Sequence, residues 1–132
     1  MAGLNAGHAF SDWPLYAGKI VPPGMFDLSP IWINHFENAA LVHFQHRTMA
    51  YAVGVLGFGL CLMLGKHATD KGVHVASLHV LALLLVQIVL GIFTVTSGVA
   101  VAIAAAHQVV ALLLFGAALW LVFAVGKGRL AA

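Results

Sequence analysis

The sequence is poor in charge and in cysteine, and both shortages limit what the protein can be. Only 8% of its 132 residues are charged, whereas 62% are hydrophobic. A water-soluble domain of this size needs many more charged side chains to cover its surface, so the composition excludes an ordinary soluble domain. The single cysteine, Cys61, excludes an internal disulfide and gives no information about the redox compartment.

Acidic and basic groups are too few and too scattered for several kinds of site. The six Lys and Arg residues form no run, which argues against nucleic acid as a partner. The only acids are Asp12, Asp27, Glu37 and Asp70, and none lies inside a long apolar segment. No glycine-rich phosphate loop and no zinc-type Cys/His spacing is present. The sequence therefore gives no support for acid/base, nucleophilic or phosphate-binding chemistry.

Three long apolar segments are the dominant feature of the sequence. They cover residues 39–65, 73–97 and 100–126, and each exceeds the roughly 20 residues that a helix needs to cross a bilayer. Short loops between them favour an antiparallel up-down bundle. We therefore predict an all-α membrane protein in which residues 39–132 form a three-helix transmembrane bundle surrounded by the lipid bilayer. Asn38 is the predicted N-cap of the first helix.

Residues 1–38 differ in composition from the bundle. They contain all four prolines of the chain: Pro14, Pro22, Pro23 and Pro30. Proline interrupts helices because it lacks the amide hydrogen and clashes with the preceding turn. Aromatic side chains in the same region suit the headgroup layer of a membrane. We predict an irregular interfacial loop, with at most short helical turns near residues 31–36.

The positions of the basic residues predict the orientation of the bundle. Lys66 and Lys71 lie beside the loop after the first span, and Lys127 and Arg129 follow the third span. Cytoplasmic loops are enriched in Lys and Arg, so this side is predicted to be the inside. The long amino-terminal loop then lies outside and the carboxyl terminus inside. The membrane is expected to be a bacterial plasma membrane, with the mitochondrial inner membrane as the alternative.

Two of the eight histidines lie at membrane depth. His46 and His107 are each eight residues into their helices, about 12 Å from the outer end at ~1.5 Å per residue. Ionisable groups at this depth are costly and indicate function. Two facing imidazoles at equal depth are what a six-coordinate haem requires as axial ligands. The alternative is that both histidines only make polar contacts within the bundle.

Neighbouring residues are compatible with a haem and also with simpler roles. His43, one turn from His46, can bind a haem propionate, replace a ligand or simply lie at the interface. Arg47 at the outer rim can bind a propionate or anchor a lipid headgroup. Small residues near the two ligands either leave room for a macrocycle or form helix contacts: Ala50, Gly54, Ala104 and Ala111. No role is assigned to His8, His35, His67 and His74, and His79 is interpreted as a hydrogen-bonded polar residue.

Four short motifs resemble the haem A synthase family. They are Gly3-Leu-Asn-Ala-Gly7, Phe36-Glu-Asn38, Phe44-Gln-His-Arg47 and Ala106-His-Gln108. Their order and spacing are similar to the carboxyl-terminal half of the family along nearly the whole chain. The resemblance implies eight transmembrane helices in two similar four-helix halves. It also implies oxidation of a methyl group of haem O, the substrate, to the formyl group of haem A, for cytochrome oxidase.

The resemblance carries over to individual residues. It implies that the carboxyl-terminal half holds a haem b between histidines that match His46 and His107. The amino-terminal half carries another histidine pair and a glutamate at the substrate site, and this chain has His43 at the position of that glutamate. Only three of the four helices of the half are recognisable here. We therefore expect a fragment or one part of a split protein, which needs the amino-terminal half or partner helices.

These observations give one expected function and two alternatives. We expect the haem-b-binding, electron-relaying half of a haem A synthase, an oxidoreductase that is not active as this chain alone and whose electron donor is unknown. The first alternative is a b-type cytochrome or membrane anchor that transfers electrons without substrate chemistry. The second is a structural bundle whose histidines bind only their neighbours.

Overall fold

Helices dominate the part of the chain that the structure describes. The computed structural model describes residues 4–130, with side chains as far as Lys127. The only strand-like feature in this part is an isolated bridge between Tyr16 and Lys19. The elements are η2 (Ala6–His8), η3 (Ile31–Ile33), α1 (Asn34–Glu37), α2 (Ala39–His67), α3 (Lys71–Thr96) and α4 (Val101–Leu130). The predicted all-α class, with three long helices after an irregular amino-terminal stretch, is confirmed.

Side-chain caps set the start of α2 and α3. The side-chain oxygen of Asn38 accepts hydrogen bonds from the backbone N–H groups of Ala40 and Leu41, at 2.9 and 3.2 Å. This confirms the predicted cap of α2, which satisfies amides that have no partner within the helix. Asp70 caps α3 in the same way, because its side-chain oxygen accepts from the backbone N–H groups of Gly72 and Val73. For that reason α3 begins at Lys71, two residues before the apolar segment that predicted it.

Glycine does not end α2 or α4 where the apolar segments end. Both Gly65 and Gly126 are helical, and the helices continue to His67 and Leu130. A glycine inside a helix costs only about 1 kcal/mol relative to alanine, so it does not by itself stop a helix. The carboxyl terminus of α2 is instead followed by Ala68, whose extended backbone ends the helix. The side chain of Arg129 lies outside the described residues.

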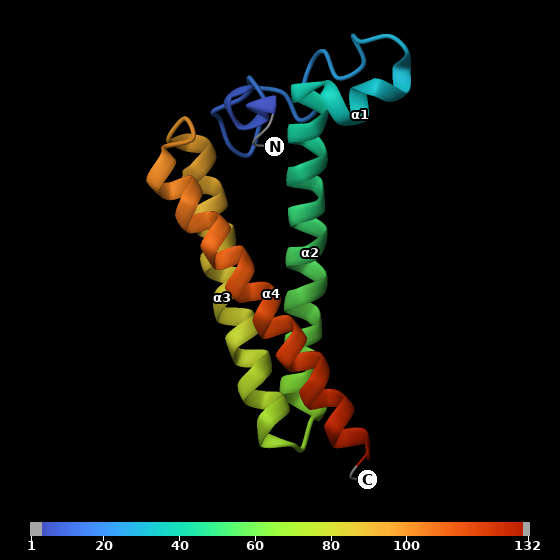
Figure 1. Cartoon of the computed structure of the whole chain (residues 1–132), viewed down its shortest axis with the longest axis vertical. Coiled ribbons are helices and arrows are strands. Elements are labelled where there is room, and N and C mark those ends of the chain that lie inside the picture. The colour runs from blue at the N-terminus through green and yellow to red at the C-terminus, as the bar shows by residue number, and fades with distance from the viewer. Residues whose placement is uncertain (1–3, 131–132) are drawn as a thin grey trace.

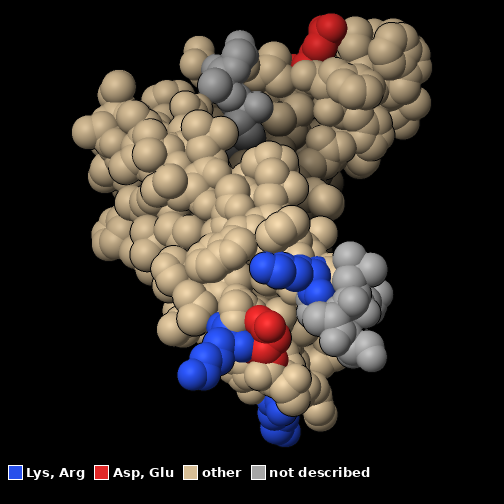
Figure 2. All heavy atoms as spheres, turned by 60° about the horizontal axis from the view of Figure 1, so that its bottom comes forward, with Lys and Arg blue, Asp and Glu red and all other residues tan. Residues whose placement is uncertain are grey.

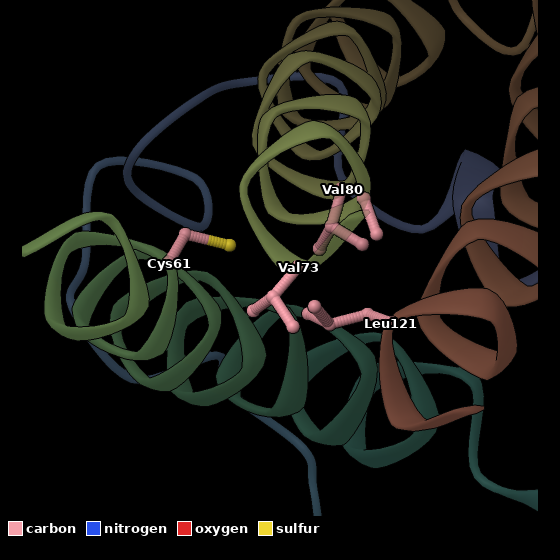
Figure 3. Packing of buried hydrophobic residues seen from close by; sticks show 5 residues of the cluster. Cys61, Val73, Val80 and Leu121 are labelled. Carbon is pink, nitrogen blue, oxygen red and sulfur yellow. The ribbon is translucent and has the colours of Figure 1, made fainter. Parts of the chain in front are cut away.

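The three long helices are not packed equally (Figure 1). Helix α3 packs against α4 along much of its length and against α2 over a shorter stretch. Figure 1 shows α2 separating from the other two helices toward the amino-terminal loop. The buried apolar cluster comprises Cys61, Val73, Ala76, Val80 and Leu121, and all but Ala76 are labelled in Figure 3. The tightest packing is therefore near the α2–α3 loop, and Cys61 is a small apolar core residue.

Glycines in α2 allow its contact with α3. A Cβ added to Gly54 would lie 3.7 Å from Cδ1 of Ile88, and one added to Gly57 would lie 3.1 Å from Cδ2 of Leu84. Small residues let helices approach closely in lipid, where no hydrophobic force drives them together. At Gly54 the interpretation as a helix contact is therefore supported.

Exposed apolar surface indicates that the bundle lies in a membrane. All three long helices are long and apolar enough to cross a bilayer, and at most 17% of the residues in their most apolar windows are buried. Contact of such an apolar surface with lipid chains costs little free energy, whereas its exposure to water is unfavourable. Figure 2 shows Lys and Arg side chains gathered at the end formed by the α2–α3 loop and the end of α4. Lys66, Lys71 and Lys127 belong to these segments. The protein is an integral membrane protein.

Candidate functional site

The two histidines at membrane depth come from α2 and α4. His46 lies two turns after the cap of α2, and its side chain is exposed. His107 lies two turns into α4, and its side chain is partly buried. The site therefore offers two nitrogen donors from two helices that are not packed tightly against each other.

His107 is held against α3 by an amide. Nε2 of Gln87 donates a hydrogen bond to Nε2 of His107 over 3.3 Å. Two atoms of this pair remain without a partner although they are buried: Nδ1 of His107 and Oε1 of Gln87. Buried polar atoms in proteins are nearly always satisfied, so two unsatisfied atoms in one pair indicate that a further partner belongs here.

A glycine of α3 makes room for the ring of His107. A Cβ added to Gly91 would lie 3.2 Å from Cε1 and 3.7 Å from Nδ1 of that ring. Gly91 is four residues after Gln87, so both lie on the same face of α3. The imidazole therefore rests between an amide and a bare stretch of helix backbone.

Arg47 binds the amino-terminal loop to α2. Its Nε donates to Nε2 of His43 over 3.0 Å. Its two terminal nitrogens donate to the backbone carbonyls of Leu15 and Asp12, at 3.0 and 2.8 Å. The guanidinium also lies 4.3 Å from the centre of the Tyr16 ring, a cation–π contact. All three nitrogens thus bind protein groups, and the residue fastens the loop to α2.

His43 is the most enclosed histidine of the site. Its side chain is fully buried. The ring centre lies 6.0 Å from that of Phe10 and 5.8 Å from that of Tyr16. Its Nδ1 has no hydrogen-bond partner. The ring is therefore enclosed between α2 and aromatic side chains of the amino-terminal loop.

Two ionisable groups of the loop are perturbed by these contacts. Burial raises the pKa of the Tyr16 hydroxyl above its ordinary value, and the nearby Arg47 opposes this effect. The pKa of Asp12 is lowered, first by the backbone N–H of Ala17 and also by that of Gly18, which donates over 3.2 Å. Hydrogen bonds from backbone N–H groups to the Asp12 carboxylate therefore hold the loop together. Arg47 attaches the loop to α2.

The other histidines make local contacts. Nδ1 of His79 is 2.8 Å from the carbonyl oxygen of Val75, and its ring packs against Trp120 with 5.3 Å between centres. His74 bonds backbone carbonyls at the α2–α3 loop. Both residues thus bond backbone carbonyls close to them in the chain.

Sequence reasoning missed Gln87 and Gly91. A signal was present, because Gln87 interrupts the most apolar part of the second span and Gly91 follows one turn later. A polar residue at such depth points to a partner on another helix. The periodicity within α3 does not identify that partner, which is 20 residues away in sequence.

These residues fit a haem. Imidazole nitrogens are common axial ligands of haem iron. The buried Nδ1 of His107 without a partner and the exposed ring of His46 are each compatible with a ligand between α2 and α4. Within the described residues, no group of three or more His, Cys, Asp or Glu side chains could hold a bare metal ion.

Comparison with known proteins identifies the family. Residues 1–119 match the family described as cytochrome oxidase assembly protein. A haem A synthase of Wolbachia pipientis wMel is 41% identical over 120 residues, which are 91% of this chain and 32% of that relative. Haem A synthases of Ruegeria sp. (strain TM1040) and Nitrosospira multiformis are each 40% identical, over 87% and 91% of this chain and 30% and 34% of the relative.

The chain spans about a third of the length of the curated relatives that it matches. No solved structure matches the chain. The family match nevertheless covers most of the sequence, including both histidines at membrane depth. The chain therefore belongs to the haem A synthase family of cytochrome oxidase assembly proteins.

Proposed function

We propose that this chain is the haem-b-binding, carboxyl-terminal part of a haem A synthase, with His46 and His107 as the axial ligands. The observation that carries the proposal is the pair of imidazoles that each lie about two turns into α2 and α4, one exposed and one with a buried nitrogen that lacks a partner. The names of the relatives support the enzyme class. When bound, the haem supplies one-electron transfer within the membrane.

The residues of the chain have separate tasks in this proposal. His46 and His107 provide neutral imidazoles, and their helix backbones fix the separation and tilt of the two rings. Arg47 and His43 hold the amino-terminal loop over the end of α2. The loop then limits access of water to the ligand histidines from that side. We further propose that the positive charge of Arg47 attracts the propionates of the haem.

The reaction itself is proposed for the whole protein. The relatives are about three times as long as this chain, and we propose that oxidation of the haem O methyl group to a formyl group needs the helices that correspond to the rest of their length. His43 stands where the resemblance puts a glutamate in the other half. We infer that the substrate is oxidised elsewhere and that this part relays electrons.

The charged end of the bundle gives the proposed orientation. Lysines gather near the α2–α3 loop and the end of α4 (Figure 2), and the positive-inside rule assigns that end to the cytoplasm. The bundle then lies in a bacterial plasma membrane, with the amino-terminal loop on its outer side.

An absorption spectrum of the purified protein with single ligand substitutions tests the proposal. We expect the parent protein to show a Soret band that shifts on reduction, and His46→Ala and His107→Ala to lose the low-spin haem. His79→Ala is the matched control, because His79 bonds the Val75 carbonyl of its own helix and packs against Trp120. A low-spin spectrum retained in both ligand variants would overturn the assignment. Conversion of haem O to haem A, measured in the complete protein, separates the synthase from a simple b-type cytochrome.

A further inference from the structure

Gln87 has a feature that the proposed ligand pair leaves unexplained. It is a polar side chain in the middle of an apolar helix, and its amide meets one ring nitrogen of His107 at 3.3 Å. The other ring nitrogen and the amide oxygen of Gln87 are both buried and have no partner. The pair is therefore half satisfied, although each member has the capacity for further hydrogen bonds.

We propose that Gln87 is the positioning residue of His107: its amide binds one ring nitrogen and so leaves the other ring nitrogen for the haem iron. The inference rests on the proposed function, since it takes His107 as an axial ligand. It goes beyond that function by assigning a residue of α3 to the control of a ligand on α4.

Hydrogen-bonding capacity explains why an amide suits this task. A histidine that binds a metal through one nitrogen carries a proton on the other, and that N–H needs an acceptor. The Nε2 amide group of Gln87 can only donate, but Oε1 can accept. Rotation of the amide by 180° exchanges these two groups at the same place. The unsatisfied Oε1 of Gln87 thus supplies the acceptor that a ligated His107 requires.

Gly91 limits the ring to the orientation that Gln87 selects. With no Cβ on Gly91, the imidazole lies directly against the backbone of α3, and a methyl group there would approach Cε1 to 3.2 Å. The ring is thus held by a hydrogen bond on one side and by close packing on another. Such outer partners fix the tautomer and orientation of a histidine ligand and raise its basicity.

Two replacements of Gln87 test the inference, one that removes the hydrogen-bond acceptor and one that strengthens it. The midpoint potential, haem affinity and electron paramagnetic resonance spectrum are measured on the protein expressed from its complete gene. Gln87→Leu removes the acceptor and is expected to weaken haem binding about 10- to 100-fold and to raise the potential. Gln87→Glu supplies a stronger acceptor and is expected to keep the haem and lower the potential. Opposite shifts are a signature that a packing defect does not produce.

Thr94→Val is the matched control for a polar residue lost from the same helix. The Thr94 hydroxyl donates to the Leu90 carbonyl within α3 over 2.7 Å, so this variant should keep the parent potential and spectrum. If Gln87→Leu does not fold, the shift in Gln87→Glu still decides the question.

The failures of the two proposals are distinguishable. Loss of low-spin haem in His107→Ala, together with parent-like potential and affinity in both Gln87 variants, would overturn the positioning role and leave the haem proposal intact. A low-spin haem signal in His107→Ala that is undiminished relative to the parent protein would overturn both.

Discussion

Single residues of α3 determine how the histidine of α4 is presented. His107 meets an amide and a bare stretch of backbone on the neighbouring helix, and neither contact is encoded near it in the sequence. A glycine at Gly91 is required because of close approach: its backbone is ordinary helix, and the space above it is filled by an imidazole ring. The requirement is therefore steric and not conformational.

Substitution of Gly91 tests this steric requirement. Gly91→Ala is expected to lower haem occupancy, because the new methyl group displaces the His107 ring by a few tenths of an ångström. Gly116→Ala on α4 is the matched control, since no neighbouring atom lies within 4 Å of its added Cβ. Both variants gain helix propensity. Haem content per protein, measured on the purified variants, should fall only in the first, and equal occupancy in both would contradict the account.

The residue scale also shows the limit of sequence reasoning. The cap at Asn38 was predictable because its partners are two and three residues away. The role of Arg47 was not, because its guanidinium binds carbonyls 32 and 35 residues earlier. Every residue has a backbone carbonyl, so the sequence does not indicate which of them accepts a hydrogen bond from a distant side chain. The partnership of Gln87 with His107 was overlooked because it too joins residues that are distant in sequence.

At the scale of elements, one arginine couples the amino-terminal loop to α2. Arg47 makes three hydrogen bonds and a cation–π contact, and its side chain is only 6% exposed. Lysine cannot reproduce this set of planar donors. Loop and helix should therefore separate when the guanidinium is removed, while α3 and α4 remain packed.

Limited proteolysis measures this attachment. Arg47→Ala is expected to release the loop and speed tryptic cleavage after Lys19, with a loss of about 1.5–3 kcal/mol from hydrogen bonds to a charged group. Arg47→Lys should give a similar but smaller effect. Lys66→Ala, at an exposed position near the other end of α2, is the control and should leave cleavage after Lys19 unchanged. Unchanged cleavage in Arg47→Ala would show that other contacts hold the loop.

The contact between α2 and α3 is tested by two glycines two residues apart. Gly57→Leu is expected to destabilise the bundle by about 1–3 kcal/mol through overpacking, because Leu84 already lies 3.1 Å from the added Cβ position. Gly59→Leu places the same side chain where nothing lies within 4 Å and should be tolerated. Thermal unfolding in detergent, followed by circular dichroism, compares them. Equal melting temperatures would contradict the packing.

The spans themselves were predictable from the sequence because each is a local run of apolar residues. The ends of the helices were less predictable. Helix α3 starts before the predicted apolar segment because Asp70 caps it, and α2 continues through Gly65 to His67. The unequal packing of the helices was also not predicted, since an up-down bundle of three helices does not specify which pairs are close. That choice depends on contacts such as those of Gly57 with α3.

At the scale of the whole molecule, tight packing and polar chemistry occupy opposite ends of α2. The apolar cluster with Cys61 lies near the α2–α3 loop, where the helices converge (Figures 1 and 3). His46 lies in the half of α2 nearer the loop that Arg47 fastens. The packed end therefore sets the relation of α2 to α3 and α4, and the looser end has the freedom to hold a ligand.

The central claim is that one haem is bound by His46 from α2 and His107 from α4. The most direct measurement is the near-infrared magnetic circular dichroism of the ferric protein, recorded for the parent, His46→Met and His107→Met. The account predicts a bis-histidine charge-transfer band in the parent, replaced in each variant by that of histidine–methionine ligation with a raised potential. An unchanged bis-histidine band in either variant would contradict it.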